Sequence, residues 1–182
     1  MALPSTLHTF DLRVSLADVG AGGEAVLKVA RHPSETMERL WLRVPAYAWK
    51  WRDGLAFGPG LSEPDAPDLL ALSPDGRAAL VVRVGRPDPA RVERDATRNA
   101  GAEVAVLLES PRHLAEFLAE ARERGLGRAA AADLAALDPP LLRALADVDA
   151  RRIGVTATLV ADHLYLEIGG RTLDGPLHRA AS

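Results

Sequence analysis

Hydrophobic and polar residues alternate in several short segments of the chain, and this pattern predicts β-strands. Two such segments, 7–17 and 24–30, flank the glycine-rich stretch "DVGAGG" and predict an N-terminal β-hairpin. A second hairpin is predicted within residues 67–87, because Asp75 and Gly76 form a strong turn signal between two apolar runs. Its second strand, 78–84, is apolar almost throughout, which is typical of a strand buried on both faces.

Apolar residues at three- and four-residue spacing predict a long helix over residues 32–54. Pro33 suits its first position and Glu35 its first turn, whereas Pro45 should kink it. Three more helices are predicted over residues 88–100, 111–125 and 138–148. Three more strands are predicted over residues 103–109, 154–160 and 163–168. Between 127 and 137 helix propensity competes with a short strand at 128–132, and the pattern leaves both open.

The order of these elements predicts an α/β (α+β) fold with a central mixed sheet flanked by helices. Hairpins are antiparallel, whereas the strand–helix–strand run at 78–109 requires a parallel pair. A chain of 182 residues without internal repeats or a low-complexity linker suits a single domain covering residues 1–182.

Composition narrows the function classes. The net charge of −3 argues against a surface coated in positive charge for nucleic acid. No apolar run approaches the roughly 18 residues that cross a bilayer, and the first residues lack the basic and apolar regions of a secretory signal. The absence of cysteine excludes disulfides and thiolate metal sites, so we expect a cytoplasmic protein without a membrane partner.

Common catalytic motifs are missing from the sequence. The cluster of Gly20, Gly22 and Gly23 lies between two strands, so it lacks the helix N-terminus that a dinucleotide-binding loop needs. There is no phosphate-binding P-loop and no Gly-x-Ser-x-Gly elbow, and the five histidines are scattered without metal-ligand spacing.

Two carboxylates remain as candidates for chemistry, Glu35 near the start of the long helix and Asp68 at the start of the second hairpin. A metal-dependent phosphodiesterase needs two or three carboxylates around a hard cation such as Mg²⁺, which polarises the phosphate and activates water. Purely structural roles stay open: a charge at the start of a helix for Glu35, and an acid at the end of a loop for Asp68.

Several segments of the chain resemble the YaeQ family, a group of bacterial proteins of unresolved biochemical role. These segments are "ARHPSETMERL" (30–40), "FGPGLSEPDAPDL" (57–69) and "VGRPDPARV" (84–92), and the resemblance covers nearly the whole chain. The family's fold is similar to that of PD-(D/E)xK nucleases, the restriction-endonuclease-like fold. The resemblance implies that Glu35 is the helix acid of such a site, that Pro67-Asp68 is its Pro-Asp, and that position 83 corresponds to its second-strand acid.

The chain departs from the nuclease pattern at that last position. Arg83 replaces the acid, and Gly85 stands where the lysine would be. A guanidinium and a divalent cation about 5 Å apart would repel by about 7 kcal/mol at an effective dielectric near 20. We therefore predict that Arg83 is at least half-buried, pairs with Asp68 or Glu35, and takes the place of the metal.

Two functions are compatible with these sequence features. The first is a catalytically degenerate nuclease-like domain that binds nucleic acid or a protein partner and has no cofactor. Its candidate contact residues are arginines on or just before the helix at 88–100, namely Arg86, Arg91, Arg94 and Arg98. Acids are interleaved with them in the sequence, so a solvated helix of mixed charge is the competing interpretation.

The second function is an active Mg²⁺-dependent nuclease. It would use Glu35, Asp68 and a third acid recruited from elsewhere, such as Asp65 or Glu63. The sequence leaves the oligomeric state open.

Overall fold

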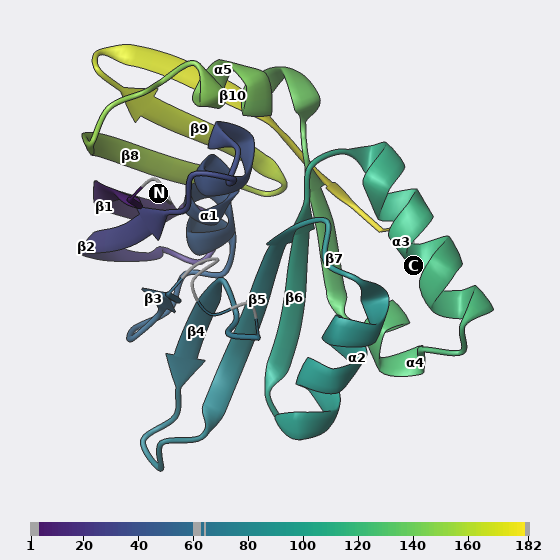
Figure 1. The fold of residues 1–182 in the computed structure, drawn as a ribbon. Coiled ribbons are helices and arrows are strands. Elements are labelled where there is room, and N and C mark those ends of the chain that lie inside the picture. Colours follow the sequence, from purple (N-terminus) through teal and green to yellow (C-terminus); the bar gives the residue numbers. More distant parts are fainter. Residues whose placement is uncertain (1–3, 60–62, 64, 181–182) are drawn as a thin grey trace.

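The structure is a computed structural model that describes residues 4–59, 63 and 65–180, so part of the segment 57–69 lies outside the described residues. Its centre is a mixed β-sheet with the strand order β2-β1-β8-β9-β10-β7-β6-β5-β4-β3 and with helices on both faces (Figure 1). The strands are β1 (Thr6–Leu16), β2 (Ala21–Arg31), β3 (Ala56–Phe57), β4 (Leu69–Leu72), β5 (Ala78–Gly85), β6 (Glu103–Leu108), β7 (Asp133–Leu137), β8 (Arg152–Val160), β9 (His163–Ile168) and β10 (Arg171–Arg179).

The strand pairing confirms the predicted mixed sheet. Both predicted hairpins form: β1 pairs antiparallel with β2, and β4 pairs antiparallel with β5. The predicted parallel pair is that of β5 and β6, and the sheet has two further parallel pairs, β6 with β7 and β1 with β8.

Helix α1 starts later than predicted. The helices are α1 (Met37–Trp49), α2 (Pro89–Arg98), α3 (Pro111–Glu123), α4 (Gly127–Ala130) and α5 (Pro139–Ala146). The hydroxyl of Thr36 accepts a hydrogen bond from Arg39 N at 3.2 Å and caps the first turn of α1. Pro33 and Glu35 therefore lie in the preceding loop, so their predicted positions inside the helix were wrong. Pro45 does lie inside α1.

Helix α1 is buried all round rather than on one face. Every residue from Leu40 to Ala48 is buried, because the sheet curves around the helix into a nearly closed barrel. The two ends of the sheet, β2 and β3, contact each other, and α5 packs against the helix as well (Figure 1). A charged side chain within the stretch 40–48, such as that of Arg43, therefore lies in the protein interior and needs a partner there.

A second core lies on the opposite face of β5, β6 and β7, where α2, α3 and α4 cover the sheet. Successive side chains of β5 point to opposite faces. Val82 and Val84 belong to the core around α1, whereas Val81 belongs to the core under α2. The alternation places Arg83 on the α2 side, and this decides which acid it meets.

Three features differ from the sequence-based expectation. The segment 127–137 contains a single helical turn, α4, followed by strand β7, so a strand exists but begins at Asp133 rather than within 128–132. Strand β10 was not predicted. It pairs with β9 through Pro176 and with β7 from Leu177, and it thereby joins the two halves of the sheet. The two-residue strand β3 was also missed.

None of the helices described by the structure is long and apolar enough to cross a membrane.

Candidate functional site

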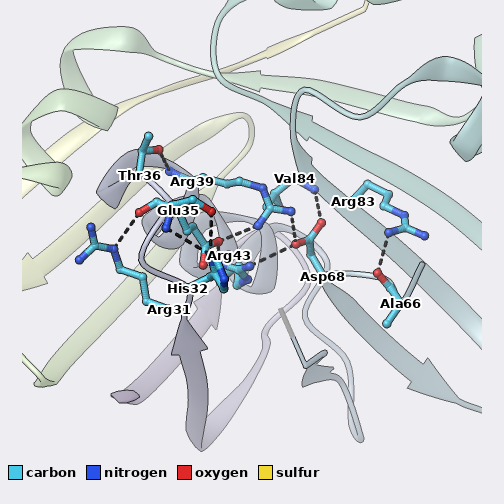
Figure 2. A network of polar contacts seen from close by, with 11 residues as sticks. Arg31, His32, Glu35, Thr36, Arg39, Arg43, Ala66, Asp68, Arg83 and Val84 are labelled. Atoms are coloured by element: carbon cyan, nitrogen blue, oxygen red, sulfur yellow. Dashed lines mark hydrogen bonds and ion pairs between the residues drawn. The ribbon is translucent and has the colours of Figure 1, made fainter. Parts of the chain in front are cut away.

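Glu35 enters the site from the loop between β2 and α1. Its backbone N–H donates to His32 O at 2.9 Å, and its carbonyl accepts from Arg31 Nε at 2.9 Å, so the loop is fixed on both sides of the carboxylate. The Glu35 side chain is fully buried. Four residues further on, in the first turn of α1, Arg39 Nη1 donates to Glu35 Oε1 at 2.6 Å (Figure 2).

Asp68 immediately precedes β4 and reaches the same region. Its backbone N–H donates to Val82 O at 3.0 Å, which continues the pairing of β4 with β5. Its Oδ2 accepts from Val84 N at 3.0 Å. Its Oδ1 accepts from Arg39 Nη2 at 2.8 Å and from Arg43 Nη2 at 3.4 Å (Figure 2).

The two acids are bridged by two arginines of α1, and we call Glu35, Arg39, Arg43 and Asp68 the acid–arginine cluster. Arg43 Nη1 lies 2.6 Å from Glu35 Oε1, so each arginine contacts both carboxylates. The formal charges of the four groups sum to zero. The Arg43 side chain is fully buried, whereas 24% of the Arg39 side chain is exposed, so Arg39 is the member that solvent reaches.

The surroundings favour the charged form of Arg39. Burial on its own would lower its pKa, but the charges of Asp68 and Glu35 and the hydrogen bonds to them outweigh burial and raise the pKa above the ordinary value. Gly85 ends β5 beside this side chain, and its backbone φ of +87° lies in the left-handed region that favours glycine.

The hydrogen bonding of the cluster is incomplete. Glu35 Oε2 and Arg43 Nε are buried and have no hydrogen-bond partner within the described part of the chain. An unpartnered buried polar atom costs about 1–3 kcal/mol, so the cluster retains some capacity to accept another donor or ligand.

Arg83 does not belong to this cluster. It is buried, as predicted, but it pairs with Asp95 of α2 through two contacts, Nε to Oδ2 at 2.7 Å and Nη2 to Oδ1 at 3.0 Å. Two further N–H groups donate to backbone carbonyls, Nη1 to Ala66 O at 2.6 Å and Nη2 to Asp65 O at 2.8 Å. The prediction that Arg83 pairs with Asp68 or Glu35 was therefore wrong: Arg83 faces α2, and Figure 2 shows it pointing away from Asp68 toward Ala66.

The third acids considered for a metal site do not complete one. Glu63 is exposed, and the Asp65 side chain is 85% exposed and lies 3.8 Å from Arg91 Nη2 of α2. Within the described residues, no group of three or more histidines and acids could hold a metal ion. Glu35 and Asp68 thus supply two carboxylates that are already neutralised, which is a poor fit to the oxygen-rich shell that Mg²⁺ requires.

Sequence reasoning found both acids and missed the cations that hold them. Arg39 and Arg43 follow Glu35 by four and eight residues, which places them on the same side of a helix. This spacing was the signal that could have identified them. Asp95 carried no comparable signal, because its partner comes from a strand on the far side of a turn.

The family profile described as "YaeQ protein" matches residues 1–175. The chain belongs to the YaeQ family. The family resemblance inferred from the three sequence segments is thereby confirmed.

YaeQ relatives are similar in sequence and in fold. The uncharacterized protein YaeQ of Escherichia coli (strain K12) is 33% identical over 112 residues, which are 62% of this chain and 61% of the relative. The alignment thus spans less than two thirds of that protein. The crystal structure of the YaeQ protein from Pseudomonas syringae has a TM-score of 0.85 at 27% identity and covers 100% of this chain and 98% of its own. That from Xanthomonas axonopodis pv. citri has a TM-score of 0.82 at 26% identity, with 97% and 99% covered.

Proposed function

We propose that this YaeQ-family protein is a non-catalytic binding module built on a nuclease-like fold, and that it works in the cytoplasm. One observation carries the proposal: Arg39 and Arg43 occupy the carboxylates that a metal-dependent nuclease would offer to its cation. A cation about 5 Å from either guanidinium would be repelled by about 7 kcal/mol at an effective dielectric near 20.

The acid–arginine cluster has a structural role in this proposal. It joins the loop before α1, the helix itself and the start of the β4–β5 hairpin, which are far apart in the sequence. Removing one member of a buried ion pair costs about 3–5 kcal/mol, so a cation that displaced Arg43 would have to offset a loss of that order. Binding then takes place on the outer surface, to nucleic acid or to a protein partner.

Incubation with labelled single- and double-stranded oligonucleotides in Mg²⁺ or Mn²⁺ tests the proposal. The expected result is that wild type leaves the substrates intact and matches Asp68→Asn, the control that keeps the shape of the side chain. Metal-dependent cleavage by wild type that disappears in Asp68→Asn would overturn it.

A second candidate, a Mg²⁺-dependent nuclease, is favoured by one detail. Glu35 Oε2 has no donor among the described residues, and Arg39 is exposed enough to swing away from the acids. Glu35 and Asp68 would then hold the cation, and the same cleavage assay separates the two candidates.

A further inference from the structure

Each acid on or next to helix α2 has a partner in the protein, although Asp88 is exposed and also pairs with Arg124 at 3.0 Å. Asp88 caps the helix by accepting a hydrogen bond from Ala90 N at 2.8 Å. Glu93 turns toward α4, where its Oε2 accepts from Ala129 N at 2.9 Å, and Asp95 holds the buried Arg83. Asp95 lies about one turn from both Arg91 and Arg98, so acids and arginines share this side of the helix. The carboxylate of Asp95 is, however, already paired with the buried Arg83.

Three arginines of α2 lie along one side of the helix. Arg91, Arg94 and Arg98 recur at three- and four-residue spacing, and we call them the arginine flank. Arg94 and Arg98 are exposed, and neither forms a hydrogen bond or ion pair with any residue that the structure describes. Arg91 lies 3.8 Å from Asp65, so Arg94 and Arg98 are the two cations that the flank offers to a ligand, about 6 Å apart along the helix.

A hollow of about 350 Å³ lies beside the flank, between α2 and the β4–β5 hairpin. Its apolar lining includes Leu70, Ala78, Val81 and Leu72, of which Leu72 is 55% exposed. Two acids also line it: Asp95, which is paired with Arg83, and Asp65, which lies 3.8 Å from Arg91. Arg98 also lines the hollow, so an anion held by this arginine would have an apolar surface next to it.

We propose that the arginine flank and this hollow bind single-stranded nucleic acid, with phosphates on the arginines and an unstacked base against the apolar surface. Guanidinium groups bind phosphate through paired hydrogen bonds. A nucleic-acid strand carries one negative charge per nucleotide, so Arg94 and Arg98 can contact neighbouring phosphates of one strand. The apolar residues beside Arg98 favour a ligand that carries bases as well as phosphates over an acidic peptide. The inference rests on the proposed function, that the protein binds without cutting.

Fluorescence anisotropy with a labelled oligothymidylate and an RNA of equal length, each of about 20 nucleotides, tests the inference at low and moderate salt. Arg94→Glu/Arg98→Glu is expected to weaken binding at least tenfold. It should also reduce the slope of log K against log salt by about 1.4, because each single-strand phosphate contact contributes about 0.7. Leu72→Asp, which leaves the arginines in place, is expected to weaken binding several-fold.

The matched control is Arg122→Glu/Arg171→Glu, which changes the charge equally at two exposed arginines elsewhere that have no side-chain partner among the described residues. Its affinity should stay within about twofold of wild type. Equal losses of affinity in both double variants, or undiminished binding by Arg94→Glu/Arg98→Glu, would contradict binding at this surface. The proposed function, a non-catalytic binding module, would not be contradicted by either result. Failure of wild type to bind either oligonucleotide at low salt would overturn the nucleic-acid ligand. Cleavage of an oligonucleotide would instead overturn the proposed function.

Discussion

Arg39 and Arg43 hold the same two acids but lie in different surroundings. Arg43 is enclosed by the curved sheet, whereas a quarter of the Arg39 side chain contacts solvent. If Arg39 is removed, water can replace part of its hydrogen bonding to the two carboxylates. Water cannot reach the buried site of Arg43 in the same way. The two residues should therefore differ in their effect on stability even though their partners are the same.

Arg43→Met is expected to lower the free energy of unfolding by about 3–5 kcal/mol, because it leaves buried carboxylate charge without its enclosed partner. Arg39→Met, the matched control, should cost clearly less. Urea unfolding of both variants measures the difference. Equal losses would show that solvent access does not separate the two arginines, contrary to our description of the cluster.

The pair of Arg83 and Asp95 allows a second test at this scale. Arg83→Met and Asp95→Leu should each destabilise by about 3–5 kcal/mol, because each leaves a lone buried charge. The double variant should lose at least about 1.5 kcal/mol less than the sum of the two, since it removes both charges. Additive losses in a double-mutant cycle would contradict a direct pair.

Single residues could be predicted only in part. The burial of Arg83 followed from its place in an apolar strand, but its partner depends on which helix covers that face of β5. Glu35 and Asp68 were recognised as candidates from their types and from the family resemblance. The arginines that neutralise them lie on a helix whose complete enclosure could not be predicted from the amphipathic pattern.

At the scale of elements, charged groups tie the C-terminal end of α1 to the starts of β6 and β7. Lys50 contacts Asp133, and its Nζ lies 2.5 Å from Glu103 Oε1, while Arg52 Nη2 lies 2.5 Å from Glu103 Oε2. Burial acts to raise the pKa of Glu103, but the hydrogen bonds from Lys50 and Arg52 outweigh it and lower the pKa below the ordinary value of 4.5.

This shift predicts a dependence of stability on pH. The folded-state pKa of Glu103 lies below the unfolded value, so its contribution is fully present above pH 4.5 and is lost as pH falls through the folded-state pKa. Glu103→Gln should therefore be less stable than wild type at neutral pH, and the two unfolding free energies should converge in acid. Denaturant unfolding across this range measures them; a constant difference would refute the assignment.

Elements with strong local patterns were predicted well, and those defined by distant partners were not. Both hairpins follow from alternation and turn residues, and α2 and α3 from their spacing and caps. Strand β7 lies in an alanine-rich segment whose helix propensity is overridden by burial in the sheet. Strand β10 contains Gly175 and Pro176, which weaken the sequence signal for a strand. It forms because it pairs with two different strands, β9 and β7.

At the scale of the whole molecule, the sheet separates two buried ion-pair systems. The acid–arginine cluster lies on the side of α1, inside the curved sheet, and the pair of Arg83 and Asp95 lies under α2. The mixed sheet could be predicted from the sequence, but the curvature that encloses α1 could not, because it arises from pairing among the ten strands of the part of the chain that the structure describes. This enclosure makes the Glu35 and Asp68 pair a closed structural feature in our proposal.

Calorimetric titration of Mn²⁺ and Mg²⁺ tests this central claim most directly. Wild type should show no saturable heat and should match Asp68→Asn. Arg39→Ala should gain weak uptake, because it leaves the cluster with a net charge of −1 and an opening to solvent, and the added change Asp68→Asn should abolish that gain. Saturable one-site binding by wild type that is lost in Asp68→Asn would contradict the account, since the two arginines would then not close the site.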